Sequence, residues 1–300
     1  MKNDMKCRFC GSKKNILWAK EPKKYYQCSD CLFISVDPIP TNNELDDHYR
    51  DYHDLNHQES LEKNSMREES YKQETQWLKK YIDFKSIKEG GFSVCDYGAS
   101  GGYFLDVIKS LVGNSSVSFY GDDKSLPAIE KLKEKKYYYN FDLNKPSGKF
   151  DLVILRGVIE HVPDFKDLLV KITESLKDNG FLFISATPNG VSTGAQLYRH
   201  NWVQHHYPSH IQHFSAHHFD YHLVKNNVIR VDSTDLYYNS IYKKESDIGV
   251  FAKSINKENY NFTNCMNQDI NNDLRHAFFG SMLTLLYQKK NNINKKRNII

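Results

Sequence analysis

The chain has no run of 18 apolar residues, so no segment of it is suited to cross a bilayer as a helix. Residues 1–4 lack the apolar core of a secretory signal peptide. Neither sign of charge dominates: 41 lysines and arginines stand against 37 acidic residues, which gives no argument for a nucleic-acid partner. With 39% hydrophobic residues in 300, we expect a soluble cytoplasmic protein with a full core.

Cysteine is scarce, and four of the six cysteines lie near the N-terminus. Cys7, Cys10, Cys28 and Cys31 form two C-x2-C pairs at the spacing of zinc sites. Four thiolates complete a tetrahedral shell and leave no position for water, so the predicted zinc site is structural. Two disulfides are the alternative, which a chain without a secretion signal disfavours. We predict a zinc ribbon over residues 1–45.

Residues 46–90 carry many charges among scattered apolar side chains. Trp77, Leu78, Tyr81 and Ile82 recur at helical spacing. We interpret this segment as a helical connector. Two alternatives stay open: the connector packs on the following domain and covers its site, or it is a solvated linker.

From residue 91 to 254, strand and helix patterns alternate, which indicates an α/β fold with a mainly parallel sheet. Phe92, Val94 and Cys95 form a short apolar strand, and apolar residues at helical spacing follow Tyr103. Between them, three glycines allow a sharp turn close to a ligand. The helix N-terminus behind this loop favours an anionic or strongly polar group.

Acidic and polar residues follow the later strands, at the edge where parallel sheets bind ligands. Asp123 ends a strand that begins at Val117, and its carboxylate is suited to the two hydroxyls of a ribose. Asp142 ends a third predicted strand, where either it or Asn140 is placed to meet an adenine amino group; a plain turn acid is the alternative. Arg156 ends the fourth strand, which begins at Phe150.

Taken together, the motifs resemble those of class I S-adenosylmethionine-dependent methyltransferases related to the ubiquinone-biosynthesis O-methyltransferases. They are D-x-G-x-[GS]-x-G at 96–102, G-x-D at 121–123, F-D-L-V with E-H-V-x-D over 150–164, and L-K-x-x-G-x-L-x-I-S-x-T-P-N at 176–189. A four-cysteine ribbon ahead of such a domain is similar to bacterial sugar methyltransferases. Tyr103 stands where a dinucleotide fingerprint has its third glycine, which argues against NAD.

This resemblance implies a Rossmann-like, seven-stranded, mainly parallel sheet with S-adenosylmethionine as cofactor. The last sheet strands are expected at Val228–Val231 and Ile248–Ala252. The cofactor-binding residues that we expect are Asp96, Gly98, Ser100, Gly102, Asp123, Asp142 and Arg156.

Histidine is concentrated between residues 200 and 222, in the loop expected to face the methyl donor: His200, His205, His206, His210, His213, His217, His218 and His222. His210, His213 and Phe214 form an H-x-x-H-F motif that resembles the substrate loop of the same family. A hydroxyl acceptor benefits from a base with a pKa near 7. The candidate bases are His210, His206 and His161. A metal held by His206, His210 and His213 is the alternative.

Two expectations concern segments around and beyond this loop. His217, His218 and His222 are predicted on the surface of a helix that Ser215 begins. The tail from 255 to 300 contains an apolar stretch, Leu274–Tyr287, that we predict to be a helix. This helix would pack on the domain, mediate dimerisation or lie on a membrane surface beside its basic end.

The function that we expect is methyl transfer to a small hydroxylated acceptor, a sugar, nucleotide sugar or glycan precursor. O-methylation is favoured over C-methylation, and aromatic residues of the histidine-rich loop would stack on the sugar. One alternative is a methyltransferase that acts on RNA or protein gripped by the ribbon. Another is a non-catalytic S-adenosylmethionine-binding protein or a dehydrogenase.

Overall fold

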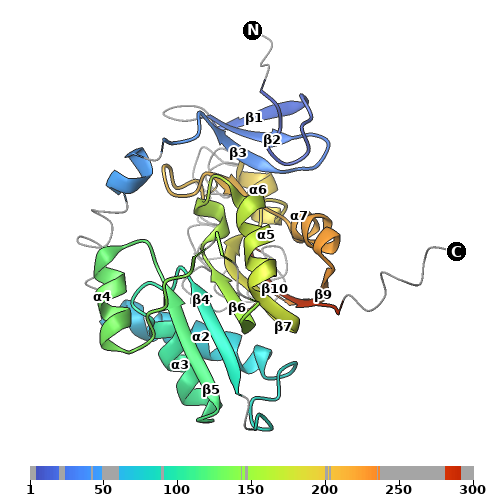
Figure 1. Ribbon diagram of the computed structural model, residues 1–300. Coiled ribbons are helices and arrows are strands. Elements are labelled where there is room, and N and C mark those ends of the chain that lie inside the picture. Colours follow the sequence, from blue (N-terminus) through green and yellow to red (C-terminus); the bar gives the residue numbers. More distant parts are fainter. Residues whose placement is uncertain are drawn as a thin grey trace, which may run out of the picture.

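A computed structural model describes residues 5–19, 24–41, 43–48, 61–88, 91–142, 144–145, 148–199, 202, 204–234, 236 and 281–291. Its main feature is a six-stranded sheet with the order β5-β4-β6-β7-β10-β9 (Figure 1). The strands are β4 (Phe92–Tyr97), β5 (Val117–Asp122), β6 (Phe150–Arg156), β7 (Leu176–Pro188), β9 (Val228–Thr234) and β10 (Met282–Lys289). Strands β5, β4, β6 and β7 run parallel, while β10 is antiparallel to both of its neighbours. This confirms the predicted α/β fold.

Helices cover both faces of the sheet, and β6 shows why. Leu152 and Ile154 point to a core formed with α2 (Leu61–Leu78) and α3 (Tyr103–Val112), whereas Val153 and Leu155 point to a core formed with α5 (Phe165–Ser175) and α7 (Ala216–Leu223). A strand buried on both faces needs an unbroken apolar sequence, and Leu152–Leu155 provide one at the centre of β6. The helix α4 (Leu126–Glu134) follows β5.

The predicted third strand is reduced to a single contact. Tyr138 forms one isolated parallel bridge with Gly121 in β5. Among the described residues, the large sheet therefore contains six strands and this bridge, where the family pattern predicts seven strands. The expected strand Ile248–Ala252 lies outside the described residues, and β9 confirms the one expected at Val228–Val231.

The predicted C-terminal helix is wrong over Met282–Tyr287, which belongs to β10. Leu283, Thr284, Leu285, Leu286 and Tyr287 are all buried, because β10 lies between β7 and β9. A continuous apolar run does not distinguish a buried strand from a buried helix by its periodicity. The sheet thus takes a strand from the segment we assigned to a tail, and the dimer or membrane contact expected from a helix there loses its basis.

The N-terminal segment forms a small antiparallel sheet of β1 (Asn15–Ala19), β2 (Lys24–Cys28) and β3 (Ile34–Asp37). This sheet is continued by β8 (Gln212–His213) from the histidine-rich loop, with Ile34 opposite His213. Figure 1 shows β1–β3 lying over α5, α6 (Thr193–Tyr198) and α7. The ribbon is therefore built onto the domain that follows it.

The connector packs on the domain, as one of the two alternatives predicts. In α2, Trp77 and Leu78 are buried, and the ring of Trp77 lies 6.0 Å from that of Phe183 in β7. Tyr71 packs 5.0 Å from Phe104 in α3. Within the described residues, no helix combines the length and apolar character needed to cross a membrane.

Candidate functional site

The glycine loop between β4 and α3 has the backbone shape that the sequence predicts. Gly98 and Gly102 adopt φ angles of 80° and 75°, and Ser100 adopts 51°. A Cβ atom on Gly98 would lie 2.5 Å from the Val158 side chain, so the turn after β6 packs directly against this loop. The position therefore requires glycine for both its conformation and its space.

Asp123 faces this loop from the end of β5. Its Oδ2 accepts a 2.9 Å hydrogen bond from the backbone N–H of Ser100, and its Oδ1 accepts one from Ser125. Each carboxylate oxygen keeps a second lone pair for a ligand hydroxyl. The structure thus brings together the loop and the carboxylate that the sequence assigns to the ribose.

Asp96, at the end of β4, is a buried carboxylate with an unused acceptor. Its side chain is 2% exposed, and Oδ1 has no hydrogen-bond partner in the described structure. Burial raises the pKa of Asp96 to about 7, against the opposing effect of the Arg156 guanidinium. A buried acceptor without a donor costs about 1–3 kcal/mol. The site therefore fits a ligand that brings a cationic or hydrogen-donating group to this oxygen.

Arg156, expected among the cofactor-binding residues, forms a buried ion pair with the connector, and its contact with a cofactor stays a prediction. Its Nε and Nη2 donate to the carboxylate of Glu74 in α2, at distances of 3.1–3.2 Å. Glu74 is fully buried and also accepts from the Ser185 hydroxyl. Breaking a buried pair of this kind leaves an uncompensated charge, so Arg156 and Glu74 fasten the connector to the sheet.

Asp142 behaves as the turn acid that the sequence left open. Its side chain is exposed, and Oδ1 accepts a hydrogen bond of 2.9 Å from the backbone N–H of Asn144. Its contact with an adenine therefore stays a prediction.

The turn after β6 carries Glu160 and His161 in the short helix η1 (Ile159–His161). Glu160 is 1% exposed, and its carboxyl accepts from the Thr187 hydroxyl. Burial raises the pKa of Glu160 to about 8. At neutral pH this group is mostly an uncharged carboxylic acid.

His210 meets this turn from the loop after β7. Ligand atoms of Glu160, His161 and His210 all lie within 4.8 Å of one another, and the two imidazole rings are 4.9 Å apart. His206 is exposed, and its ring lies 5.1 Å from that of His210. Of the three predicted bases, the structure brings His161 and His210 together and places His206 next to His210 at the surface.

The hydrogen bonds decide which nitrogen of His210 carries the proton. Its Nδ1 lies 2.8 Å from the carbonyl oxygen of Gln204, and a carbonyl only accepts. Nδ1 therefore bears the hydrogen, and Nε2 of the neutral ring is an acceptor that makes no hydrogen bond to the described residues. His161 donates from Nδ1 to the Ser209 carbonyl in the same way, at 2.9 Å.

Burial and the neighbouring imidazoles keep these rings uncharged. Burial, together with His161 and His206, lowers the pKa of His210 well below its usual value. Burial likewise lowers the pKa of His161 to about 4. At neutral pH, Glu160, His161 and His210 thus form an uncharged cluster in which Nε2 of His210 is available as an acceptor.

The predicted metal set of His206, His210 and His213 is not assembled. Among the described residues, only the four cysteines and the Glu160, His161 and His210 group bring three or more such ligand atoms that close together. His213 is fully buried and joins His205 instead, with 3.1 Å between Nε2 and Nδ1.

Other residues of the histidine-rich loop form core rather than a binding surface. Trp202 and Phe214 are buried, so they are not free to stack on a sugar as expected. Ser215 caps α7 as predicted, and His217 is exposed. His218 is buried, contrary to the expected surface position, because its ring completes the cap and reaches the Cys31 carbonyl.

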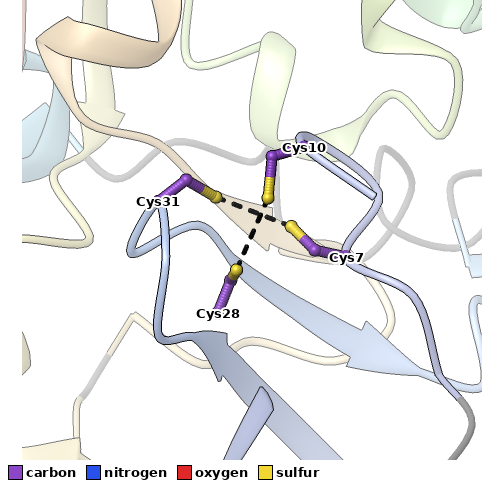
Figure 2. A group of neighbouring side chains, drawn as sticks. All are labelled: Cys7, Cys10, Cys28 and Cys31. Atoms are coloured by element: carbon purple, nitrogen blue, oxygen red, sulfur yellow. Dashed lines mark hydrogen bonds between the residues drawn. The ribbon is translucent and has the colours of Figure 1, made fainter. Parts of the chain in front are cut away.

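The four N-terminal cysteines converge on one point (Figure 2). The sulfur atoms of Cys7 and Cys31 are 3.6 Å apart, as are those of Cys10 and Cys28. A disulfide would need about 2.05 Å. Tetrahedral zinc with Zn–S bonds of about 2.3 Å places sulfurs about 3.8 Å apart. The cluster thus has the donors and the spacing of a four-thiolate zinc site.

Comparison with known proteins decides the family. Residues 50–227 match the family model described as "Methyltransferase domain". The chain belongs to this methyltransferase family. The match supports S-adenosylmethionine-dependent methyl transfer as the activity. No curated protein matches the chain by sequence.

Solved structures share the fold of this methyltransferase at low identity. A chain from the complex of the Haloferax volcanii Trm112 methyltransferase activator with a methyltransferase is 12% identical, with a TM-score of 0.53 over 81% of this chain and 98% of that one. A SAM-dependent methyltransferase from Archaeoglobus fulgidus is 18% identical, with a TM-score of 0.43 over 72% and 92%. The StiE O-MT is 16% identical, with a TM-score of 0.47 over 80% and 81%.

Sequence reasoning missed the residues that orient the site. Glu160 stands beside His161 in the E-H motif, and this adjacency was the available signal for it. Ser209 and Glu74 contact residues 48 and 82 positions away, for which the sequence carries no local signal. Gln204 is six positions from His210 and acts through its backbone carbonyl, which its side-chain type does not reveal.

The titration of Asp96 predicts how pH changes the affinity of this methyltransferase for S-adenosylmethionine. The ligand is cationic and favours the ionised carboxylate, whose pKa is about 7 without ligand. Affinity should therefore rise roughly tenfold from pH 6 to pH 8, then level off. Titration calorimetry measures this. The Asp96→Asn variant should lose the rise while keeping any titration of the ligand itself; an equal rise in both proteins would contradict the assignment.

Proposed function

We propose that the protein transfers a methyl group from S-adenosylmethionine to a hydroxyl group of a small molecule, with His210 as the general base. The observation that carries this proposal is the single imidazole nitrogen of His210 left free by the Gln204 bond, beside the turn that packs on the glycine loop. Such a nitrogen accepts a proton without first releasing one.

The residues divide into two sets. The glycine loop, Asp96 and Asp123 would hold the donor, which supplies a methyl group already activated on a sulfonium. On the other side, Nε2 of His210 would take the proton as the acceptor oxygen attacks the methyl carbon. The methyl–sulfur bond breaks in the same step, and its electron pair returns to the sulfur of the departing S-adenosylhomocysteine. Holding both reactants in line contributes on the order of 7–11 kcal/mol.

The acceptor proposed is a hydroxylated compound of the sugar, nucleotide-sugar or glycan-precursor class, with an uncharged hydroxyl as its reacting group. Neutral His161, neutral His210 and an uncharged Glu160 carboxyl favour an uncharged reacting group. The carbohydrate class itself rests on the resemblance of the ribbon and domain to bacterial sugar methyltransferases. Turnover of a sugar-nucleotide panel with labelled S-adenosylmethionine tests it.

The four-cysteine cluster is proposed to hold a structural zinc ion. Four thiolates leave no open coordination position, so the ion would stabilise the ribbon and take no part in methyl transfer.

Replacing Asp123 by alanine tests the donor site. Because the carboxylate is proposed to accept both ribose hydroxyls, S-adenosylmethionine should bind at least about tenfold more weakly. Calorimetry measures the affinity. Asp178→Ala, which removes the same charge from an exposed position, is the control and should bind normally. Unchanged affinity in Asp123→Ala would refute the ribose assignment.

Action on RNA or protein remains the alternative from the sequence. A macromolecular substrate gripped by a basic ribbon would bind more weakly as salt rises. Salt-dependent RNA binding that the ribbon lysines Lys13 and Lys14 control would favour this alternative over the small-molecule acceptor.

A further inference from the structure

We infer that the N-terminal ribbon is a clamp for the catalytic base. In this clamp Arg8 and Tyr25 are positioning residues that hold the His161 turn and the His210 loop against each other. The inference rests on the proposed role of His210. It differs from a ribbon that grips a substrate, because the contacts that carry it point into the domain.

The first contact path starts between two zinc-ligand candidates. Arg8 lies between Cys7 and Cys10; its Nη1 donates to Oε1 of Gln212 at 2.9 Å, and its Nη2 donates to the Pro163 carbonyl. Because Arg8 only donates, it fixes Gln212 with the amide oxygen towards the ribbon. The amide nitrogen of Gln212 must then point the other way.

That nitrogen holds the turn of the catalytic site. Nε2 of Gln212 donates to the carbonyl oxygens of Ile159 at 3.0 Å and Val162 at 2.6 Å, on either side of Glu160 and His161. Gln212 is fully buried, so no water replaces these partners at low cost. Arg8, which lies between Cys7 and Cys10, is thereby linked through the Gln212 side chain to the backbone that carries His161.

The second path reaches His210 itself. The hydroxyl of Tyr25 in β2 donates to the His210 carbonyl at 2.8 Å. The next residue, Ile211, accepts from the Val36 N–H of β3 at 2.9 Å and donates to the Glu160 carbonyl at 3.1 Å. The ribbon therefore holds the backbone on both sides of the bond that joins His210 to Ile211.

The cysteine cluster sets the position of both paths. Arg8 belongs to one C-x2-C knuckle, the turn between Cys7 and Cys10. In the other knuckle, Cys28 to Cys31, the Cys31 carbonyl oxygen lies 2.9 Å from Nε2 of His218 at the start of α7. Such knuckles take their closed shape from the metal that they bind. Loss of the metal should thus loosen the base before it affects the donor site. The donor-site residues lie at the ends of β4 and β5 and in the loop before α3, and among the described residues they make no hydrogen bond to the ribbon.

Tyr25→Phe removes one hydroxyl and tests the clamp. We expect kcat to fall roughly 10- to 100-fold, as for a misplaced catalytic group, with S-adenosylmethionine affinity and zinc content unchanged. The matched control is Tyr26→Phe, which removes the hydroxyl of the neighbouring buried tyrosine and should leave kcat within about twofold. Equal kcat in the two variants would overturn the inference.

Arg8 gives an independent second variant. Arg8→Met should lower kcat in the same way, and Arg8→Lys should restore it only in part, because a single ammonium does not reproduce the fork that contacts Gln212 and Pro163. Lys14→Met, which removes a charge from an exposed ribbon residue, is the control. Loss of donor affinity in Arg8→Met to the same extent as kcat would show a general structural defect and overturn the positioning role.

A spectroscopic measurement separates this inference from the proposed function. In the full-length zinc-loaded protein, the imidazole NMR resonances of His210 should move in Tyr25→Phe and stay in place in Tyr26→Phe. Unmoved His210 resonances would overturn the clamp whatever the activity. If they move while the unaltered protein methylates no hydroxyl acceptor, the clamp stands and the proposed function fails.

Discussion

Replacing His210 by glutamine should lower kcat about 100- to 10,000-fold while S-adenosylmethionine binds as before. General base catalysis contributes a factor of this size, and glutamine offers no nitrogen lone pair to accept the proton. The donor contacts lie on other elements, so the affinity for the donor should be preserved. Initial rates and calorimetry on the same protein preparation measure the two quantities.

Two matched variants sharpen the His210 experiment. His206→Gln changes the exposed neighbouring ring, and His217→Gln changes an exposed ring on α7. If His206→Gln loses the activity and His210→Gln retains it, the base is His206 and our assignment is wrong. His217→Gln should have no effect.

The pH profile supplies an independent check on His210. Burial and the neighbouring imidazoles lower its pKa well below the usual value of about 6.5. A lowered histidine pKa preserves the neutral, proton-accepting form into acid solution. At saturating S-adenosylmethionine, where the Asp96 titration does not limit donor binding, the kcat/KM value for the acceptor should therefore stay level from pH 8 to about 6.5 and fall only below that. A fall already centred near pH 7 would contradict the neutral cluster.

Removing zinc should have the second large effect, on stability. Structural zinc in small domains contributes on the order of 10–16 kcal/mol of apparent binding free energy at neutral pH. The ribbon core of Trp18, Tyr25, Ile34 and Val36 is small and shares Trp202 and Ile211 with the histidine-rich loop. Chelation should thus unfold the ribbon and release this loop. Metal analysis and thermal unfolding with and without a chelator measure both changes.

Cysteine variants make the zinc prediction specific. Cys28→Ser should reduce the zinc content of the purified protein and lower its unfolding temperature. Cys95→Ala changes a buried cysteine of β4 outside the cluster and should keep one zinc ion per chain. Full zinc content in Cys28→Ser, or a metal-free native protein with unchanged stability, would contradict the four-thiolate site.

Features encoded by neighbouring residues were predictable from the sequence. The glycine loop needs glycine at 98 and 102 because of local backbone angles, and Asp123 follows its strand by one position, so their meeting at the sheet edge follows from parallel topology. The C-x2-C pairs likewise carry their own geometry. In each case the chemistry depends on spacing along the chain.

Partners distant in the chain were decided only by the tertiary structure. Met282–Tyr287 forms a strand because β7 and β9 flank it, and its apolar run by itself is equally consistent with a helix. The pairing of Arg156 with Glu74, 82 positions away, has no signal in the sequence.

The same holds for the proposed base and its clamp. Nothing around His210 in the sequence shows that its Nδ1 donates to the Gln204 carbonyl or that its own carbonyl accepts from the Tyr25 hydroxyl. By itself the sequence determined a methyl-donor loop and a cysteine cluster, because each is a short segment with its own geometry. The tertiary structure decided the hydrogen bonds on which our choice of His210 as the base rests, because side chains and carbonyls of separate segments meet only on folding.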